Sequence, residues 1–286
     1  MFDLAWPRKI IPLLQISLTD VSNSSASCLI TQIPQVYGFL LDDNSWSLNM
    51  RLRSYIWPDN LPHNLKRKCG QSVTPTHLLN CNRFISFRSK VHDSVRDQLY
   101  CMCKSYGIVS FLEPVLASLF DDTDVDKSFG NSRGEVIFPG LDGSFIIADV
   151  MSIDVCNDSN KKLAKSNAKN PLLIGEKFKM QKYCAKLKLL NSASHSNYLL
   201  YPFVFSLYGS LGESVSSLLE IFVKIVKEKT SRTFDLRFWK NRIVFAIFKG
   251  MVTSVSSALL SLGRHYEDKV GENFQLGNLD FEDIDY

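Results

Sequence analysis

From residue 133 to residue 149 the chain reads RGEVIFPGLDGSFIIAD, and this stretch decides the fold that we expect. Two apolar runs flank a turn at residues 139–143, whose Pro and Gly residues are typical of hairpins. One acid, Glu135, precedes the first run, and another, Asp149, ends the apolar part of the second. An acid at the end of an apolar strand is hard to explain by packing. The stretch therefore predicts paired strands that carry two neighbouring carboxylates.

A lysine-bearing helix is expected to follow these strands, in the segment from Glu176 to Tyr183. Two carboxylates can bind a hard cation such as Mg²⁺ or Mn²⁺, which polarises a phosphate and activates water. A lysine can then stabilise the charge that develops on phosphorus. Lys179 and Lys182 both fit this role and share a helix face, so the spacing leaves the choice open. The alternative is a solvated basic helix that contacts nothing.

The periodicity of apolar residues predicts a mixed α/β layer structure. The order is helix, strand, strand, helix, strand, helix. The expected helices are 92–118 (one or two helices, with Gly107 as a stop), 175–190, 214–229 and 238–262, and the expected strands are 136–138, 144–153 and 198–207. Residues 157–170 read as a polar, mobile segment, and residues from 263 onward read as an acidic tail.

The distribution of charge points to a polyanionic partner. The 286-residue chain has a formal net charge of only +4, but the lysines between Lys161 and Lys188 are accompanied by a single acid, Glu176. Such asymmetry suits a cationic face for DNA, or for RNA, rather than for a small-molecule substrate. A solvated lysine-rich helix is the alternative. The expected nucleic-acid contacts are Lys161, Lys162, Lys165, Lys169, Lys177 and Lys186.

The seven cysteines are scattered and odd in number, which favours thiols over disulfides. The first sixteen residues lack the apolar core of a signal peptide. No run reaches the ~18–20 apolar residues of a membrane span, and the nearest, 198–211, is broken by Pro202 and Gly209. We therefore expect an intracellular protein of the nucleus or cytoplasm that is neither secreted nor membrane-bound.

Four residues suggest a small Cys/His module: Cys69, His77, Cys81 and, as a fourth candidate, His92. Thiolates and imidazoles are the ligands of tetrahedral Zn²⁺, and a closed structural site needs four of them. The alternative is a set of free thiols and a surface histidine.

Short blocks in a fixed order resemble the C-terminal region of reverse transcriptase-like polyproteins of non-LTR retrotransposons. There, a Cys/His knuckle precedes a restriction-enzyme-like endonuclease of the PD-(D/E)XK class. The resemblance covers roughly residues 48–262. Its blocks are Arg51-Leu52-Arg53, Lys68-Cys69-Gly70, His77 to Cys81, Val91-His92-Asp93, Leu112-Glu113-Pro114, Arg133-Gly134-Glu135, Ala148-Asp149-Val150 through Asp154, Glu176 to Tyr183, Pro202 through Gly212 and Arg242 to Val252.

The resemblance implies a PD-(D/E)XK core with a small central mixed sheet flanked by helices. The expected division is a helical or loop lead-in (1–60), a Cys/His module (61–92), an endonuclease-like domain (93–212), C-terminal helices (213–263) and an acidic tail (264–286). The implied activity is Mg²⁺-dependent nicking of DNA.

In this reading Glu135 and Asp149 hold the cation, Glu113 completes its shell, and Lys179 or Lys182 acts in catalysis. Three departures from the family pattern keep an alternative open. The first cysteine of the family's knuckle is absent. Glu135 stands where the family has Asp, and Ser206 stands where it has an acid in the following strand. The alternative is a catalytically inactive, nucleic-acid-binding remnant of such an element.

Overall fold

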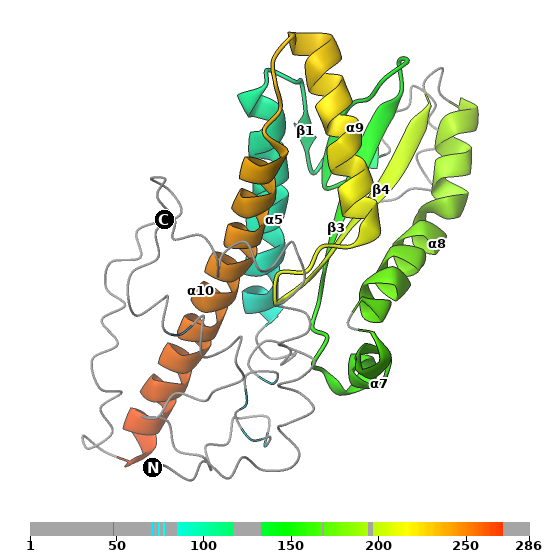
Figure 1. The fold of residues 1–286 in the computed structure, drawn as a ribbon. Helices are drawn as coiled ribbons and strands as arrows, with labels where there is room; N and C mark the ends of the chain where they lie inside the picture. The colour runs from blue at the N-terminus through cyan, green and yellow to red at the C-terminus, as the bar shows by residue number, and fades with distance from the viewer. Residues whose placement is uncertain are drawn as a thin grey trace.

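The computed structural model describes residues 85–116, 133–167, 169–193 and 197–270, together with the isolated residues 48, 70, 72, 74 and 77. In chain order these residues form α5, β1, β2, β3, α7, α8, β4, α9 and α10. The predicted α/β class is confirmed, because a mixed sheet lies between helices (Figure 1). Most of the expected lead-in, most of the Cys/His module and the end of the tail lie outside the described residues.

The sheet has four strands in the order β1-β2-β3-β4. Their bounds are β1 Phe111–Leu112, β2 Val136–Pro139, β3 Phe145–Ile153 and β4 Tyr198–Ser206. The first three strands form an antiparallel meander, and β4 runs parallel to β3 after a helical crossover. The predicted hairpin at residues 139–143 is confirmed, with Gly143 at φ 72° in the tight turn.

Alternation along the strands divides the core into two layers. On one face, Val136, Phe138 and Ala148 pack with α5, α9 and α10 in the larger apolar cluster. On the other face, Ile137 and Ile147 pack in a smaller cluster with residues of α8. Asp149 follows Ile147 by two positions, so its side chain lies on the α8 face. In Figure 1, α8 accordingly lies across the sheet from α5 and α10.

Four of the helices lie where the apolar periodicity predicts them. Their bounds are α5 Ile85–Ser105, α8 Asn170–Ala193, α9 Glu213–Thr230 and α10 Leu236–Val270. Val91, Val95, Leu99 and Met102 of α5 are all buried, as their spacing predicts. Gly107, at φ 69°, follows the end of α5 as the expected stop.

Three expectations about local structure are wrong. The segment 157–170 contains a helix, α7 (Asp158–Ser166), whose N-cap Asn157 accepts a hydrogen bond from the Asn160 backbone N–H at 2.8 Å. The residues after Gly107 form the short strand β1 rather than a second helix, because they pair with β2. α10 continues to Val270, past the expected start of the tail.

The apolar helix α10 includes one stretch, Leu236–Leu259, that is long and apolar enough to cross a membrane by length and composition. Within the structure, 78% of its most apolar window is buried. Its neighbour is α5, which lies alongside it (Figure 1). Packing against the core therefore accounts for the apolar sequence.

The described cysteines Cys101, Cys103, Cys156 and Cys184 are all free thiols. Burial raises the pKa of Cys103 to about 12, with a smaller opposing effect of hydrogen bonds and Lys104. A thiol with this pKa stays protonated and unreactive at neutral pH, so Cys103 acts as a core residue.

Candidate active site

Asp149 and Lys179 form the centre of the candidate site. Asp149 lies in the middle of β3 on the α8 face and is only 2% exposed. The Lys179 ammonium of α8 lies 2.5 Å from Asp149 Oδ2, and its side chain is 11% exposed. Burial raises the pKa of Asp149, and the positive charge of Lys179 opposes that rise. The two chain segments predicted to supply an acid and a lysine therefore meet.

Lys182, the other lysine candidate, occupies a different position. Its ammonium lies over the Tyr183 ring, 5.1 Å from the ring centroid, and its side chain is exposed. Its charge lowers the pKa of Asp149, but less than that of Lys179 does. The structure thus separates two residues that the sequence could not: Lys179 contacts the acid, and Lys182 lies at the rim.

Tyr183 connects the core to the site. Its ring is buried in the smaller apolar cluster. Its hydroxyl, however, hydrogen-bonds to the Arg133 carbonyl at 3.2 Å and to Asp149 Oδ1 at 3.4 Å. Burial, and then the nearby charge of Asp149, raise the pKa of Tyr183. A protonated hydroxyl donates to the carboxylate and helps to orient it.

Glu135 lies next to Asp149 across the β2–β3 hairpin. The register pairs Val136 with Ala148, so Glu135 and Asp149 are the next opposing positions. The carboxylate of Glu135 lies 3.1 Å from His92 Nε2, and His92 Nδ1 lies 3.2 Å from Asp93 Oδ1. Burial alone would raise the pKa of Glu135, but the His92 hydrogen bond and the charges of His92 and Lys179 lower it.

Glu113 is held beside this pair by arginine. Its carboxylate contacts the Arg96 guanidinium and lies 3.7 Å from Arg133, rather than contacting Asp149. Its backbone N–H donates to the Glu135 carbonyl at 2.8 Å, which joins β1 to the start of β2. At φ 49° Glu113 adopts a left-handed conformation, which costs about 1–2 kcal/mol in a non-glycine residue. The surrounding contacts hold that conformation and fix the side chain.

The His92–Glu135 pair predicts a pH-dependent contribution to stability. Glu135 and Asp93 raise the pKa of His92 above 6.5 despite the opposing effect of burial, so its contribution is present below pH 6.5 and lost at higher pH. The pKa of Glu135 lies below 4.5, so its contribution is present above that pH and lost in acid. Replacing His92 with glutamine should cost about 1 kcal/mol near pH 5.5 and less near pH 9.

Urea denaturation of the wild type and of His92→Gln at both pH values measures this difference. Glu135→Gln should reproduce it, since either change removes the same pair. A His92→Gln cost that stays constant, or grows, between about pH 5.5 and pH 9 would contradict the assignment.

The carboxylates of Asp149 and Glu135 are the groups that could hold a divalent metal. Asp149 Oδ2 is buried, and among the described residues its contact is the ammonium of Lys179 at 2.5 Å. Within the described ranges, no cluster of three or more His, Cys, Asp or Glu side chains is arranged to hold a metal ion. Mg²⁺ is usually bound through one or two carboxylates plus water and substrate phosphate. The pair therefore fits Mg²⁺ or Mn²⁺.

The other predicted residues are distributed along α7, α8 and the N-terminal region. Lys161, Lys162 and Lys165 lie on α7, Lys169 immediately precedes α8, and Lys177 and Lys186 lie on it. Of the zinc candidates, Cys69 and Cys81 lie outside the described residues. The His77 backbone N–H donates to Thr74 Oγ1 at 3.1 Å. His92 lies instead among the carboxylates described above.

Two groups in this cluster were missed by sequence reasoning, namely Arg96 and His92 as a partner of Glu135. Both side chains come from α5, and their i, i+4 spacing places them on one helix face. That spacing is the signal that would have indicated a shared role. No protein-family model matches the chain, and no curated protein matches it.

Proposed function

We propose that the protein is a metal-dependent endonuclease that hydrolyses phosphodiester bonds in DNA. The observation that carries the proposal is the buried Asp149 carboxylate, which faces Lys179 at 2.5 Å and lies beside Glu135, the residue immediately before the neighbouring strand β2. Two carboxylates and an ammonium at one point of a sheet match the needs of phosphoryl transfer, which depends on positioning and on charge stabilisation.

In this proposal the fold is a PD-(D/E)XK-like core. Support comes from the three-stranded antiparallel meander, the crossover through α8 and the parallel return strand β4. The crossover helix also delivers Lys179 to the carboxyl-bearing end of the hairpin. The order of sequence blocks that resemble the retrotransposon endonuclease adds to this support. The Zn²⁺ module of Cys69, His77, Cys81 and, as the fourth candidate, His92 stays a prediction.

Asp149 and Glu135 would hold Mg²⁺, which when bound supplies a Lewis acid for the phosphate and an acidified water. Tyr183 orients Asp149 through its hydroxyl, and His92 and Arg96 hold Glu135 and Glu113. Lys179 stabilises the negative charge that grows on the phosphoryl oxygens as water attacks and one P–O ester bond breaks. Lysines of α7 and α8, such as Lys161 and Lys186, would contact neighbouring phosphates.

A plasmid-nicking assay tests the proposal. Supercoiled DNA incubated with the wild-type protein should convert to the open circular form with Mg²⁺ or Mn²⁺, and should stay supercoiled with EDTA. Ca²⁺ serves as a control, since it is a larger ion with more flexible coordination. Absence of nicking at every Mg²⁺ and Mn²⁺ concentration would reject the enzymatic function.

One observation favours a second candidate, a catalytically inactive DNA-binding module. Each carboxylate of the cluster already has a cationic partner: Lys179 for Asp149, His92 for Glu135 and Arg96 for Glu113. A set of acids neutralised in this way can be a structural network alone. This candidate predicts salt-sensitive DNA binding without metal-dependent cleavage.

A further inference from the structure

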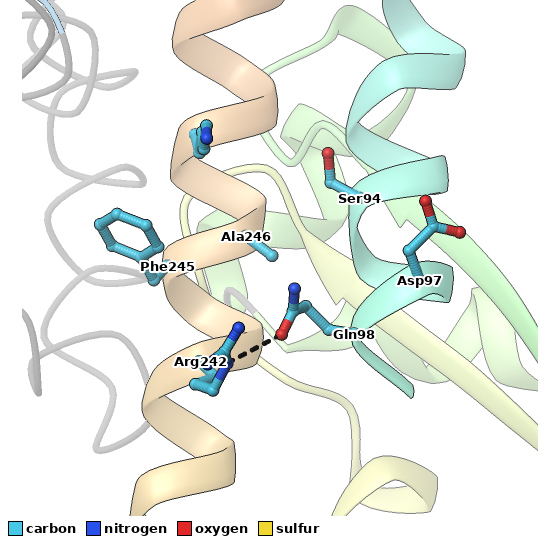
Figure 2. A pocket seen from close by; sticks show the side chains of 7 residues that line it. Ser94, Asp97, Gln98, Arg242, Phe245 and Ala246 are labelled. Atoms are coloured by element: carbon cyan, nitrogen blue, oxygen red, sulfur yellow. Dashed lines mark hydrogen bonds between the residues drawn. The ribbon is translucent and has the colours of Figure 1, made fainter. Parts of the chain in front are cut away.

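A pocket lies between α5 and α10, away from the carboxylate cluster. The two helices approach closely at Gly250, where an added Cβ would lie 2.8 Å from Val91 Cα. Next to this contact the helices leave a cavity of about 300 Å³ (Figure 2). It is lined by Ser94, Asp97, Gln98, Arg242, Phe245, Ala246 and Lys249.

Ser94 and Gln98 of the pocket lie on a different side of α5 from the candidate active site, although Arg96 hydrogen-bonds both to Asp97 of the pocket and to Glu113 of the site. Ser94 and Gln98, which line the pocket, each lie two positions from a residue of the carboxylate cluster, His92 or Arg96. Two positions on an α-helix correspond to about 200° of rotation. The pocket is therefore a separate site, and the catalytic proposal does not use it.

Arg242 and Lys249 give the pocket two cations. They lie seven positions apart on α10, and thus on one helix face. The Arg242 Nε–H donates to Gln98 Oε1 at 3.0 Å, and its guanidinium lies 5.8 Å from the Phe238 ring and 5.7 Å from the Trp239 ring. Figure 2 shows Arg242 and Gln98 reaching toward each other across the gap between the helices. These contacts orient the guanidinium in advance.

Asp97, the one acid that lines the pocket, is neutralised from another direction. Its Oδ1 accepts hydrogen bonds from Arg96 Nε at 2.9 Å and from Arg96 Nη2 at 2.8 Å. In Figure 2 its carboxylate is directed away from α10. The charge that the pocket presents is therefore that of Arg242 and Lys249.

We propose that this pocket binds a phosphate group, and that the phosphate is one of the nucleic-acid backbone. An oriented guanidinium and an ammonium beside a side-chain amide are donors suited to phosphate oxygens. The cavity also leaves room beside the phosphate for the adjoining sugar. The nucleic-acid source rests on the proposed function, whereas the phosphate chemistry rests on the pocket itself. The site would add a contact on α5 and α10 to those expected on α7 and α8.

Fluorescence anisotropy with a labelled DNA duplex tests the proposal, in EDTA so that no cleavage occurs. The test variant is Arg242→Gln/Lys249→Gln, and the matched control is Arg237→Gln/Lys240→Gln, which removes the same charge from the same helix outside the pocket. The test variant should bind roughly ten-fold more weakly than the control at ~0.1 M salt, and its slope of log K against log salt should be smaller by about 0.9. Circular dichroism checks that both double variants fold. If the test variant does not fold, the single substitution Lys249→Gln, at an exposed position, replaces it in the assay.

A second arm separates the two sources of phosphate. Thermal unfolding is followed with inorganic phosphate or a mononucleotide. If phosphate or a mononucleotide stabilises the wild type and the control but not the test variant, the pocket is supported as a phosphate site. If the salt slopes of DNA binding agree in that case, the ligand of the pocket is a free phosphate compound rather than nucleic acid. Equal DNA binding by both double variants, with no effect of phosphate or mononucleotide, would overturn the proposal.

The pocket and the nuclease can fail independently. If the wild type nicks plasmid while the test and control variants bind DNA equally and neither phosphate nor a mononucleotide stabilises the wild type, the pocket assignment fails and the nuclease stands. If DNA binding depends on the pocket but no nicking occurs, the pocket stands and the nuclease fails.

Discussion

Replacing Asp149 with asparagine is expected to lower the rate of Mg²⁺-dependent nicking by about 10³-fold or more, a loss of about 4 kcal/mol of transition-state stabilisation. Asparagine keeps the shape of the side chain and its contact with Tyr183, but it removes the charge that would bind the cation. Asp149 is the most deeply buried acid of the cluster, at 2% exposure. Initial rates of open-circle formation over a range of Mg²⁺ concentrations measure the effect.

Asp154→Asn is the matched control for this substitution. Asp154 is also buried, at 3% exposure, but its Oδ1 accepts a hydrogen bond from the Cys156 backbone N–H at 2.8 Å and serves a turn. Its variant should nick within a few-fold of the wild-type rate if it folds. Nicking by Asp149→Asn at the wild-type rate would contradict the assigned metal ligand.

The hairpin and its two acids could be predicted because their signals are local. Glu135 and Asp149 flank an apolar-turn-apolar pattern, and strand alternation then places Asp149 on a defined face. The buried helices α5 and α9 were predictable for the same reason, since their apolar residues repeat at helical spacing. α7 was missed because Leu163 and Ala164 are its only apolar residues, too few to set a period. Its stability comes from the Asn157 cap and from packing against α8.

The choice between Lys179 and Lys182 could not be made from sequence, because it depends on how α8 is rotated against the sheet. Tyr183 and Gly175 set that rotation: Tyr183 is buried, and a Cβ on Gly175 would lie 2.6 Å from Ile153 Cδ1. With this face inward, Lys179 points to Asp149 and Lys182 to the rim. His92 was assigned to zinc because chain proximity relates it to Cys81, whereas its partner Glu135 is reached only through the fold.

Replacing Lys179 with methionine is expected to lower the free energy of unfolding by about 3 kcal/mol at neutral pH. Methionine retains most of the apolar stem but leaves the Asp149 carboxylate buried without its 2.5 Å partner. Removing one member of a buried ion pair is costly because the other charge stays desolvated. Lys182→Met is the control and should cost under ~0.5 kcal/mol, since its ammonium is exposed. Urea denaturation of both variants and of the wild type provides the comparison.

The pH dependence of the Lys179→Met cost distinguishes a lost charge partner from lost packing. The pKa of Asp149 is already raised above its ordinary value of 3.8 by burial, and removing Lys179 removes the main opposing effect. A carboxyl group whose pKa is higher in the folded state than in the unfolded state lowers stability at pH values above the unfolded pKa. At such pH values the carboxyl ionises freely in the unfolded chain, whereas in the folded chain it must either carry a buried charge or retain its proton. The destabilisation should therefore shrink as pH falls toward 3.8. If the cost stays constant across that range, Lys179 acts through its stem, and the ion pair with Asp149 contributes nothing to the stability of the site.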